Sequence, residues 1–301
     1  MTEKMLRWRD ALQFRVLAEC RGPVVSAYDL GVQLAHLVHE GHYQGRPLSL
    51  PGQGLNARMW YEARTELERR GVVLQERWLP KGYYLTAAGK TADPIEILCA
   101  IDPFGYAAYF SAMSIHGLSD RLPRIVYFVT PEPGRWKQLA REKMTRDLGD
   151  ARPDDSENTL PPLRHTSVPK IHGNVIQTIR TKETGGWRHL REERIRVATL
   201  GRTFLHMIQK PDYCGGLAHV IDVYREHAPS NLAVILSELS QHGTDIDRVR
   251  VGYILEERCG VSDRRLDDWL RYAARGGSRK LDVKAEYAPV FSERWSLSIN
   301  D

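Results

Sequence analysis

The sequence predicts an α+β protein, in which a small N-terminal domain of helices and a β-hairpin precedes a larger mixed α/β domain. Apolar residues recur at helical spacing three times within residues 4–70 and then give way to two short β-rich runs, whereas helical and strand patterns are interspersed after residue 91. At 301 residues the chain is long enough for two domains. We therefore expect domains at residues 1–90 and 91–301, with an irregular excursion at about 147–169.

Two helices are expected at the start of the N-terminal domain. The first covers residues 4–20 and stops before Pro23, because proline cannot continue a helix. The second begins after Ser26, a favourable N-cap residue, and ends at Gly41. Residues 41–54 contain four glycines and two prolines, so a loop is expected there.

The third expected helix covers about residues 55–70 and ends at Gly71, because glycine favours the position that follows a helix. Its apolar residues are four apart and define one buried side: Leu55, Met59, Ala63 and Leu67. The opposite side carries five residues that can bond phosphates or base edges: Arg58, Tyr61, Arg64, Thr65 and Arg69. Glu62, Glu66 and Glu68 share this helix, so the alternative is a solvated face of ion pairs.

A hairpin is expected after the third helix. Residues 72–78 and 83–86 are β-rich and are separated by a short turn at 79–82. Arg77 and Lys81 are candidates for phosphate contacts, with ordinary surface charge as the alternative. Three helices followed by a hairpin are typical of a winged helix-turn-helix, in which the third helix enters the major groove and the wing touches the DNA backbone.

The net charge of the chain lies in this N-terminal domain. Residues 4–90 hold thirteen lysines and arginines against eight acids, an excess of five that equals the net charge of +5 of the whole chain. The remainder is therefore neutral. A small basic domain beside a larger neutral one indicates that one end of the chain binds a polyanion, here double-stranded DNA.

In the larger domain, helices and strands are expected to alternate. Helical patterns occur at residues 94–101, 107–116, 199–208, 216–227, 231–242, 246–259 and 263–275. Strand patterns occur at 124–130, 175–181 and 194–198, and residues 280–299 are expected to form strand, turn, strand. A second basic run is formed by Arg188, Arg191, Arg194, Arg196 and Arg202, relieved by Glu192 and Glu193. Three interpretations of this run are open: a contact with an acidic partner, an extension of the DNA-binding surface, or a solvated face.

The sequence contains no phosphate-binding loop, no GxSxG nucleophile motif and no zinc-binding motif. The four cysteines, Cys20, Cys99, Cys214 and Cys259, are far apart and form no CxxC pair, so reduced thiols are expected. His36, His39 and His42 lack the spacing of a zinc-binding HExxH motif. The N-terminus is too polar for a signal peptide, and no apolar run reaches the roughly 18 residues of a membrane span. We expect a cytoplasmic protein that uses no cofactor or metal and does not contact a membrane.

Three parts of the larger domain resemble the AbiEi-type antitoxins of bacterial abortive-infection systems. The first is residues 109–119, followed by Pro123 and the strand 125–129. The second is residues 195–205 with 210–216, in which His206 stands where an acid is common in the family. The third is residues 250–256 with 295–300. Together they cover roughly residues 105–300 in the same order as in the family.

This resemblance implies the antitoxin of a type IV toxin–antitoxin pair. Such proteins repress their own operon by binding inverted repeats through the N-terminal domain, and their C-terminal domain counters a nucleotidyltransferase-like toxin. The expected function is therefore a DNA-binding transcriptional repressor and antitoxin for phage defence, and not an enzyme. The expected partners are operator DNA and the toxin, directly or indirectly, with a single copy in solution and two copies on DNA. The loop at 41–54 makes this N-terminal domain larger than the shortest family members, so base contacts are not transferred.

A nuclease is the alternative from another functional class. Asp154, Asp155 and Glu157, with Asp282 and Lys284, loosely resemble the acids and the acid-x-Lys element of PD-(D/E)xK nucleases. In that fold carboxylates hold Mg²⁺ and the lysine assists the attacking water. The first three acids lie in the irregular stretch, far along the sequence from the lysine, so the repressor is preferred. A transcription factor without a toxin is a third alternative.

Overall fold

The structure is a computed structural model that describes residues 5–52, 54–121, 124–153, 160–190, 194–273 and 279–301. The chain divides into two compact units, each built of helices and strands, as the predicted α+β class requires. Unit 1 contains Met1–Gly105, Val129–Thr184 and Arg191–Ile195, and unit 2 contains Tyr106–Phe128, Gly185–Leu190 and Arg196–Asp301. The expected boundary at residue 90 does not coincide with this division, because residues 129–184 pack with the N-terminal part of the chain.

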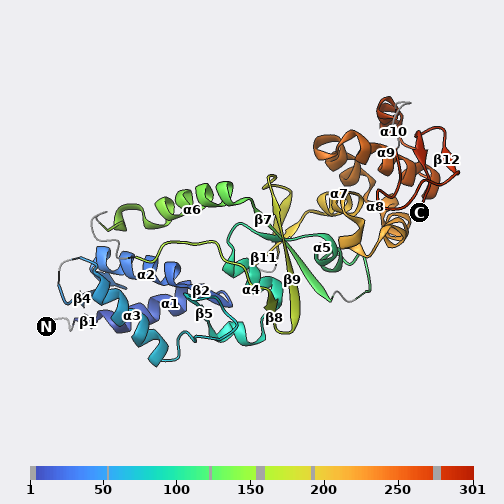
Figure 1. Cartoon of the computed structure of the whole chain (residues 1–301). Helices are drawn as coiled ribbons and strands as arrows, with labels where there is room; N and C mark the ends of the chain where they lie inside the picture. The colour runs from blue at the N-terminus through green and yellow to red at the C-terminus, as the bar shows by residue number, and fades with distance from the viewer. Residues whose placement is uncertain (1–4, 53, 122–123, 154–159, 191–193, 274–278) are drawn as a thin grey trace. The chain divides into compact units, whose positions relative to one another are not determined.

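Unit 1 begins with three helices around one core. Its first elements are β1 (Leu6–Arg7), α1 (Trp8–Glu19), β2 (Val24–Ser26), α2 (Ala27–Glu40), β3 (His42–Tyr43), β4 (Arg46–Ser49), α3 (Ala57–Arg69) and β5 (Tyr83–Leu85) (Figure 1). Leu12, Leu34 and Leu67, one from each helix, are almost fully buried in this core. The first helix starts at Trp8 because residues 6–7 pair as a strand, and Lys4, where its start was expected, lies outside the described residues.

Helix α2 has the boundaries that its capping residues predict. Ser26 Oγ accepts a hydrogen bond from the Asp29 backbone N–H at 3.0 Å, and Asp29 Oδ2 accepts one from the Ser26 backbone N–H at 3.0 Å. This reciprocal pair is a capping box, which satisfies donors that the first helical turn leaves free. At the other end Gly41 has a φ of 68°, the left-handed conformation that glycine adopts without strain.

Replacing Ser26 with alanine is expected to lower the free energy of unfolding by about 1 kcal/mol, because the Asp29 N–H loses its partner. Urea denaturation followed by circular dichroism measures the difference. Ser167, which is exposed, provides the control, since Ser167→Ala should change stability by less than about 0.5 kcal/mol. Equal stability of Ser26→Ala and the wild type would show that the capping box contributes nothing.

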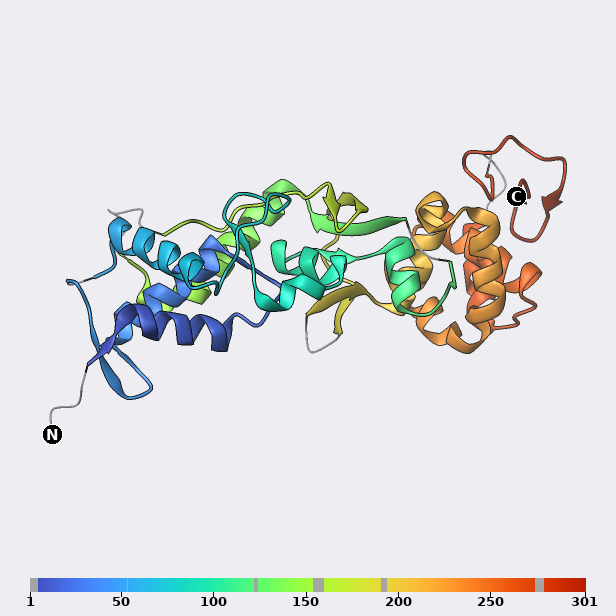
Figure 2. The ribbon, with the colours of Figure 1, turned by 90° about the horizontal axis from the view of Figure 1, so that it is seen from below.

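The stretch 41–54 is not the loop that was expected. Strands β3 and β4 form an antiparallel hairpin, and β4 also pairs in parallel with β1 (Figure 2). Gln44 and Gly45 at its turn have φ values of 50° and 78°, the two left-handed residues that a tight hairpin needs. Leu48 of β4 is buried in the core, and this burial fixes the register. The glycines therefore marked a turn within a small sheet.

The hairpin expected after α3 is also different in the structure. Residues 72–78 form a single bridge, Leu74↔Leu85, and β5 pairs along its length with β2 in antiparallel register. The physical reason is burial: Val72 and Val73 turn into the core directly after α3, so pairing starts only at Leu74. The order of elements is strand, helix, strand, helix, hairpin, helix, bridge and strand.

Part of the rest of unit 1 covers a second face of α2. The rest of unit 1 consists of η1 (Ala87–Thr91), α4 (Pro94–Ile101), α6 (Pro133–Leu148), η2 (Gly149–Ala151), β8 (Lys170–Ile171), β9 (Asn174–Thr181) and the end of β7 (Ile125–Pro131), in strand order β7-β9-β8. Tyr28 and Val32 of α2 pack with Trp136 of α6 and with Leu163. Residues 160–163 therefore lie against α2, within the stretch where an exposed excursion was expected. Helix α2 is buried on two sides.

Unit 2 consists of helices and of strands that pair in the order β10-β11-β6-β7. Its elements are β6 (Tyr106–Ala107), α5 (Tyr109–Ile115), the start of β7, β10 (Trp187–Leu190), β11 (Ile195–Ala198), α7 (Leu200–Gln209), η4 (Pro211–Cys214), α8 (Leu217–His242), α9 (Asp245–Tyr253), η5 (Ile254–Arg258), α10 (Arg264–Trp269), η6 (Leu270–Tyr272), β12 (Phe291–Ser292) and β13 (Leu297–Ser298). The helical stretches expected at 216–227 and 231–242 are one helix, α8, with a kink at Asn231 that follows Pro229.

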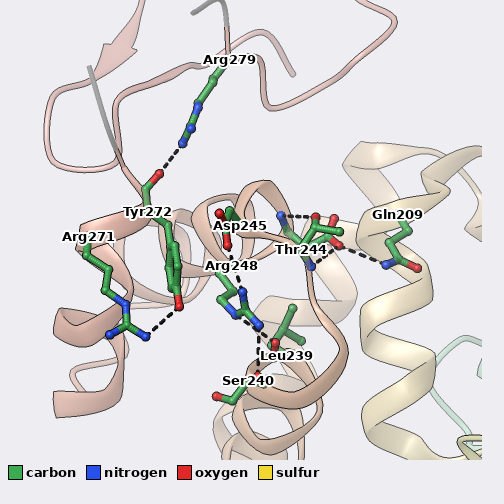
Figure 3. Close-up of polar contacts among 10 residues, drawn as sticks. Gln209, Leu239, Ser240, Thr244, Asp245, Arg248, Arg271, Tyr272 and Arg279 are labelled. Atoms are coloured by element: carbon green, nitrogen blue, oxygen red, sulfur yellow. Dashed lines mark hydrogen bonds and ion pairs between the residues drawn. The ribbon is translucent and has the colours of Figure 1, made fainter. Parts of the chain in front are cut away.

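The corner between α8 and α9 is held by side chains (Figure 3). Arg248 of α9 donates to the backbone oxygens of Leu239 at 3.1 Å and Ser240 at 3.0 Å, so it satisfies carbonyls at the end of α8. The buried carboxylate of Asp247 accepts from the Thr244 N–H and from Gln209 of α7, both at 3.0 Å. Three helices are therefore tied together at one point.

His206 of α7 is buried, and within the described residues its Nδ1 has no hydrogen-bond partner. Burial, reinforced by the nearby charge of Arg202, lowers the pKa of His206 to about 3. An unfolded histidine has a pKa near 6.5, so between pH 6.5 and 3 only the unfolded chain takes up this proton. The free energy of unfolding is therefore expected to decrease as the pH is lowered from 6.5 to 3.

His206→Met removes this titration, because it replaces the imidazole with an apolar side chain of similar length. Its midpoint of urea unfolding is expected to fall less steeply than that of the wild type when the pH is lowered from 7 to 5. Parallel midpoint curves for the two proteins would contradict the assigned pKa.

Candidate nucleic-acid interface

Helix α3 presents the side that the sequence predicts. Asn56 caps it by accepting from the Met59 N–H at 2.9 Å, and Met59, Ala63 and Leu67 are buried. The side chains on the opposite face are exposed to solvent. The exposed fraction is 89% for the Arg58 side chain, 67% for the Arg69 side chain and 61% for Tyr61, and Thr65 is exposed as well. Four of the five predicted α3 residues therefore form one accessible face, called the α3 face below: Arg58, Tyr61, Thr65 and Arg69.

Glutamates of α3 pair with both arginines of this face. Arg58 Nε lies 3.0 Å from Glu62, and Arg69 contacts Glu66 through two hydrogen bonds of 2.7 and 2.8 Å. Arg9 and Arg58 lower the pKa of Glu62, and Arg69 and Arg70 bring that of Glu66 to about 2. The ion pairs that the sequence offered as an alternative are therefore formed.

Arg64 differs from the other predicted residues of α3. Its side chain is 38% exposed, its Nε is buried without a hydrogen bond, and its guanidinium carbon lies 5.4 Å from the Tyr61 ring centroid. Its charge also acts on the buried Tyr84, where it opposes the burial that raises the pKa of that tyrosine. Arg64 is therefore held against the body of unit 1, and the α3 face does not include it.

Arg77 and Lys81 are exposed in the turn between α3 and β5, and neither forms an ion pair within the described residues. Lys81 lines a cavity of about 670 Å³ beside α3, together with Trp60 of that helix and the segment 160–164. Arg164 in this segment is exposed and lines the same cavity. The structure thus brings Lys81 and Arg164 to the flank of α3, while Arg77 is not part of this cavity.

Two cations near α3 could not be found from its own sequence. Arg9, at the start of α1, lies 2.6 Å from Glu62 and is 45% exposed. Arg164 follows α3 by about a hundred residues. No spacing rule connects either residue with α3, because tertiary packing alone brings them to this side of unit 1.

The second basic run does not form one surface. Arg202 is buried and lies 2.6 Å from Glu238 of α8, and Arg196 is buried in β11. Arg188 and Arg194 are exposed, and Arg191, Glu192 and Glu193 lie outside the described residues. The two buried arginines, Arg196 and Arg202, are part of the interior of unit 2. The prediction that they belong to a basic surface is therefore wrong.

Of the residues of the alternative nuclease site, the structure describes only Asp282 and Lys284. Asp154, Asp155 and Glu157, along with Pro123 of the resemblance, lie outside the described residues. Asp282 Oδ1 accepts from the backbone N–H of Lys284 at 2.8 Å, and Lys284 Nζ contacts the Asp212 carboxylate. Among the described residues, no group of three or more histidines, cysteines, aspartates and glutamates is placed to hold a metal ion. Likewise, none of their helices is both long and apolar enough to cross a membrane.

Comparison with known proteins gives little further information. No family model matches the chain, and no curated protein matches it. The crystal structure of the Rv2827c protein from Mycobacterium tuberculosis is similar over 98% of this chain and 92% of that one, at 15% sequence identity and a TM-score of 0.46. A likeness at this level carries no argument about function.

Proposed function

We propose that the chain is a cytoplasmic DNA-binding transcriptional repressor, in which α3 enters the major groove of operator DNA. The observation that carries the proposal is the α3 face, where two arginines, a tyrosine and a threonine are exposed together on a helix whose other side is fixed in a core. Guanidinium groups can bond phosphates and the O6/N7 edge of guanine, and threonine can contact a base or its methyl group.

The glutamates on α3 do not exclude DNA contact. Exposed ion pairs within a helix contribute little, because solvent screens them and two long side chains must be held in place. A phosphate or a guanine edge offers the arginines equivalent acceptors. Arg70 is held more firmly, since it contacts Asp10 and Gln13 of α1 as well as Glu66. We therefore assign Arg58 and Arg69 to DNA and Arg70 to the stability of unit 1.

The backbone of the DNA would pass along the flank of α3. Lys81 and Arg164 face the cavity there and have no ion-pair partner within the described residues, so they are available to phosphates. Arg77, in the same turn as Lys81, is exposed and supplies a further cation. The order of elements around β2, α2, α3 and β5 supports a winged helix-turn-helix, with the turn before β5 in the position of the wing.

A gel-shift titration with the DNA upstream of its own gene tests the proposal. We expect a specific complex whose affinity falls steeply between about 50 and 200 mM salt, because each phosphate contact releases a counterion. Scrambled DNA of the same length should bind more weakly and with a similar salt dependence. Equal affinity for upstream and scrambled DNA, or no complex with either, would contradict a sequence-specific repressor.

We propose further that the chain is the antitoxin of a type IV pair. This step is supported by the resemblance of residues 109–119, 195–205 with 210–216, and 250–256 with 295–300 to AbiEi-type antitoxins. It predicts an adjoining gene for a nucleotidyltransferase-like toxin. Expression of that gene alone should arrest growth, and co-expression of this chain should restore it. Arrest that persists on co-expression would leave a repressor without an antitoxin role.

A further inference from the structure

Unit 2 contains a cavity of about 260 Å³ that the proposed DNA contacts do not use. Its wall includes four apolar or aromatic side chains: Phe110, Ile125, Tyr127 and Tyr213. Arg121 and Arg124 line it as well. These residues come from α5, from the segment before β7, from β7 itself and from η4, and all belong to unit 2. Two of the segments that resemble AbiEi-type antitoxins, 109–119 and 210–216, therefore meet at this cavity.

The aromatic side of the cavity is a packed cluster. The rings of Tyr127 and Tyr213 lie 5.2 Å apart, and both contact the ring of Tyr109, at 6.2 and 5.3 Å between centroids. Tyr109 stacks in turn on His206 at 4.6 Å. Tyr109 is buried and has a φ of 53°, a conformation that a bulky residue keeps only when its surroundings enforce it. The cluster therefore holds Tyr127 and Tyr213 in fixed positions.

The charged side of the cavity is positive. Within the described residues neither Arg121 nor Arg124 has a carboxylate at ion-pair distance, and both are exposed. The lining also includes Asp212, whose carboxylate contacts Lys284, and this contact raises the pKa of the lysine. His219, beside Arg121, has a lowered pKa because of desolvation and that arginine, so it is neutral at pH 7. Two guanidinium groups thus remain uncompensated next to an aromatic wall.

We propose that this cavity binds a free nucleoside 5′-monophosphate. Arginine matches the geometry of phosphate through paired N–H donors, and aromatic side chains stack on any nucleobase. The volume lies below the range of about 300–1,000 Å³ that is usual for drug-sized ligands, which favours one base with one phosphate. The phosphate contacts Arg121 and Arg124, and the base packs against Tyr127 and Tyr213. This inference is independent of DNA binding by α3.

Isothermal titration calorimetry of the full chain tests it, with AMP, adenosine, inorganic phosphate and the dinucleoside phosphate ApA as probes. We expect AMP to bind about tenfold or more tightly than adenosine or phosphate, since each of these keeps only half of the contacts. Arg121→Ala/Arg124→Ala should weaken AMP about tenfold or more and leave adenosine unchanged. Both arginines are exposed, so this variant should fold.

Two further variants separate the parts of the site. Tyr213→Leu should weaken AMP and adenosine alike without changing phosphate binding. Arg58→Ala/Arg69→Ala removes both arginines of the α3 face and should bind AMP as tightly as the wild type. This control tests whether AMP binds at the α3 face instead of the cavity. The proposal fails if AMP is not bound, if phosphate binds as tightly as AMP, or if the Arg121/Arg124 variant retains AMP. Tighter binding of ApA than AMP would also overturn it, in favour of a nucleic-acid strand as ligand.

Discussion

Replacing Arg58 and Arg69 together with alanine is expected to reduce affinity for operator DNA by about 100-fold or more, with no loss of fold. The two side chains are the most exposed arginines of α3 and together supply the guanidinium groups of the α3 face. A base-reading arginine typically accounts for about tenfold or more in affinity, and two well-separated losses add approximately in free energy. Their removal leaves Glu62 and Glu66 without these partners, and the resulting negative charge repels DNA further.

Gel-shift titrations at fixed salt measure this effect, and circular dichroism checks the fold. The matched control is Arg225→Ala/Arg265→Ala, which removes two exposed, ion-paired arginines of unit 2 and changes the net charge equally. That control should lower affinity only slightly. If both double variants weaken DNA binding by the same factor, then general charge and not α3 governs binding, and the proposed reading helix is wrong.

Trp295→Ala is expected to lower the free energy of unfolding of unit 2 by about 3–5 kcal/mol, a typical range for a large buried aromatic residue. Trp295 is fully buried, and its indole N–H donates to Glu256 at 2.8 Å. Its removal leaves a cavity in contact with α9 and takes a donor away from Glu256. Chemical denaturation followed by circular dichroism should show the loss, whereas Tyr287→Ala, at a residue that is 51% exposed, should change stability by less than about 0.5 kcal/mol.

The fit of Trp295 depends on Gly252. A Cβ at Gly252 would lie 2.1 Å from the ring carbon Cη2 of Trp295, so the two groups cannot coexist without movement. Gly252→Ala is therefore expected to destabilise the protein by about 1–3 kcal/mol, even though alanine favours a helix more than glycine does. In a Trp295→Phe background the same change should cost less, because the smaller ring leaves room. An equal cost in both backgrounds would show that the contact is not limiting.

Local signals in the sequence predict several elements of the fold. Ser26 and Gly41 mark the ends of α2, and the strand and helix patterns locate β7 and α4 to within a residue. Helix α6 was not predicted because it buries only a narrow stripe, Trp136, Ala140 and Leu148, along sixteen residues. An amphipathic pattern this weak cannot be distinguished from an exposed segment. The pairing of β5 with β2 could not be predicted from the sequence of either strand, because the two strands are far apart along the chain.

The candidate interface shows the same distinction. Helical periodicity separates Met59 and Leu67 from Arg58 and Arg69, and the i to i+4 spacing predicts the pair of Arg58 with Glu62. The position of Arg64 near Tyr84 depends on β5, which lies beside β2 only in the folded chain. The arrival of Arg164 beside α3 depends on the path of residues 160–164 across α2, which no local rule describes.

The two-sided burial of α2 means that the basic end of this protein is not a detachable module. A fragment of residues 1–90 would retain α1, α2 and α3 but would lose α6 and Leu163, which cover Tyr28 and Val32. The uncovered stripe would be an apolar patch on a small protein and would favour aggregation. Domain exchange between related proteins, in nature or by design, would therefore have to transfer residues 129–184 together with the first 105, although a different segment separates them in the gene.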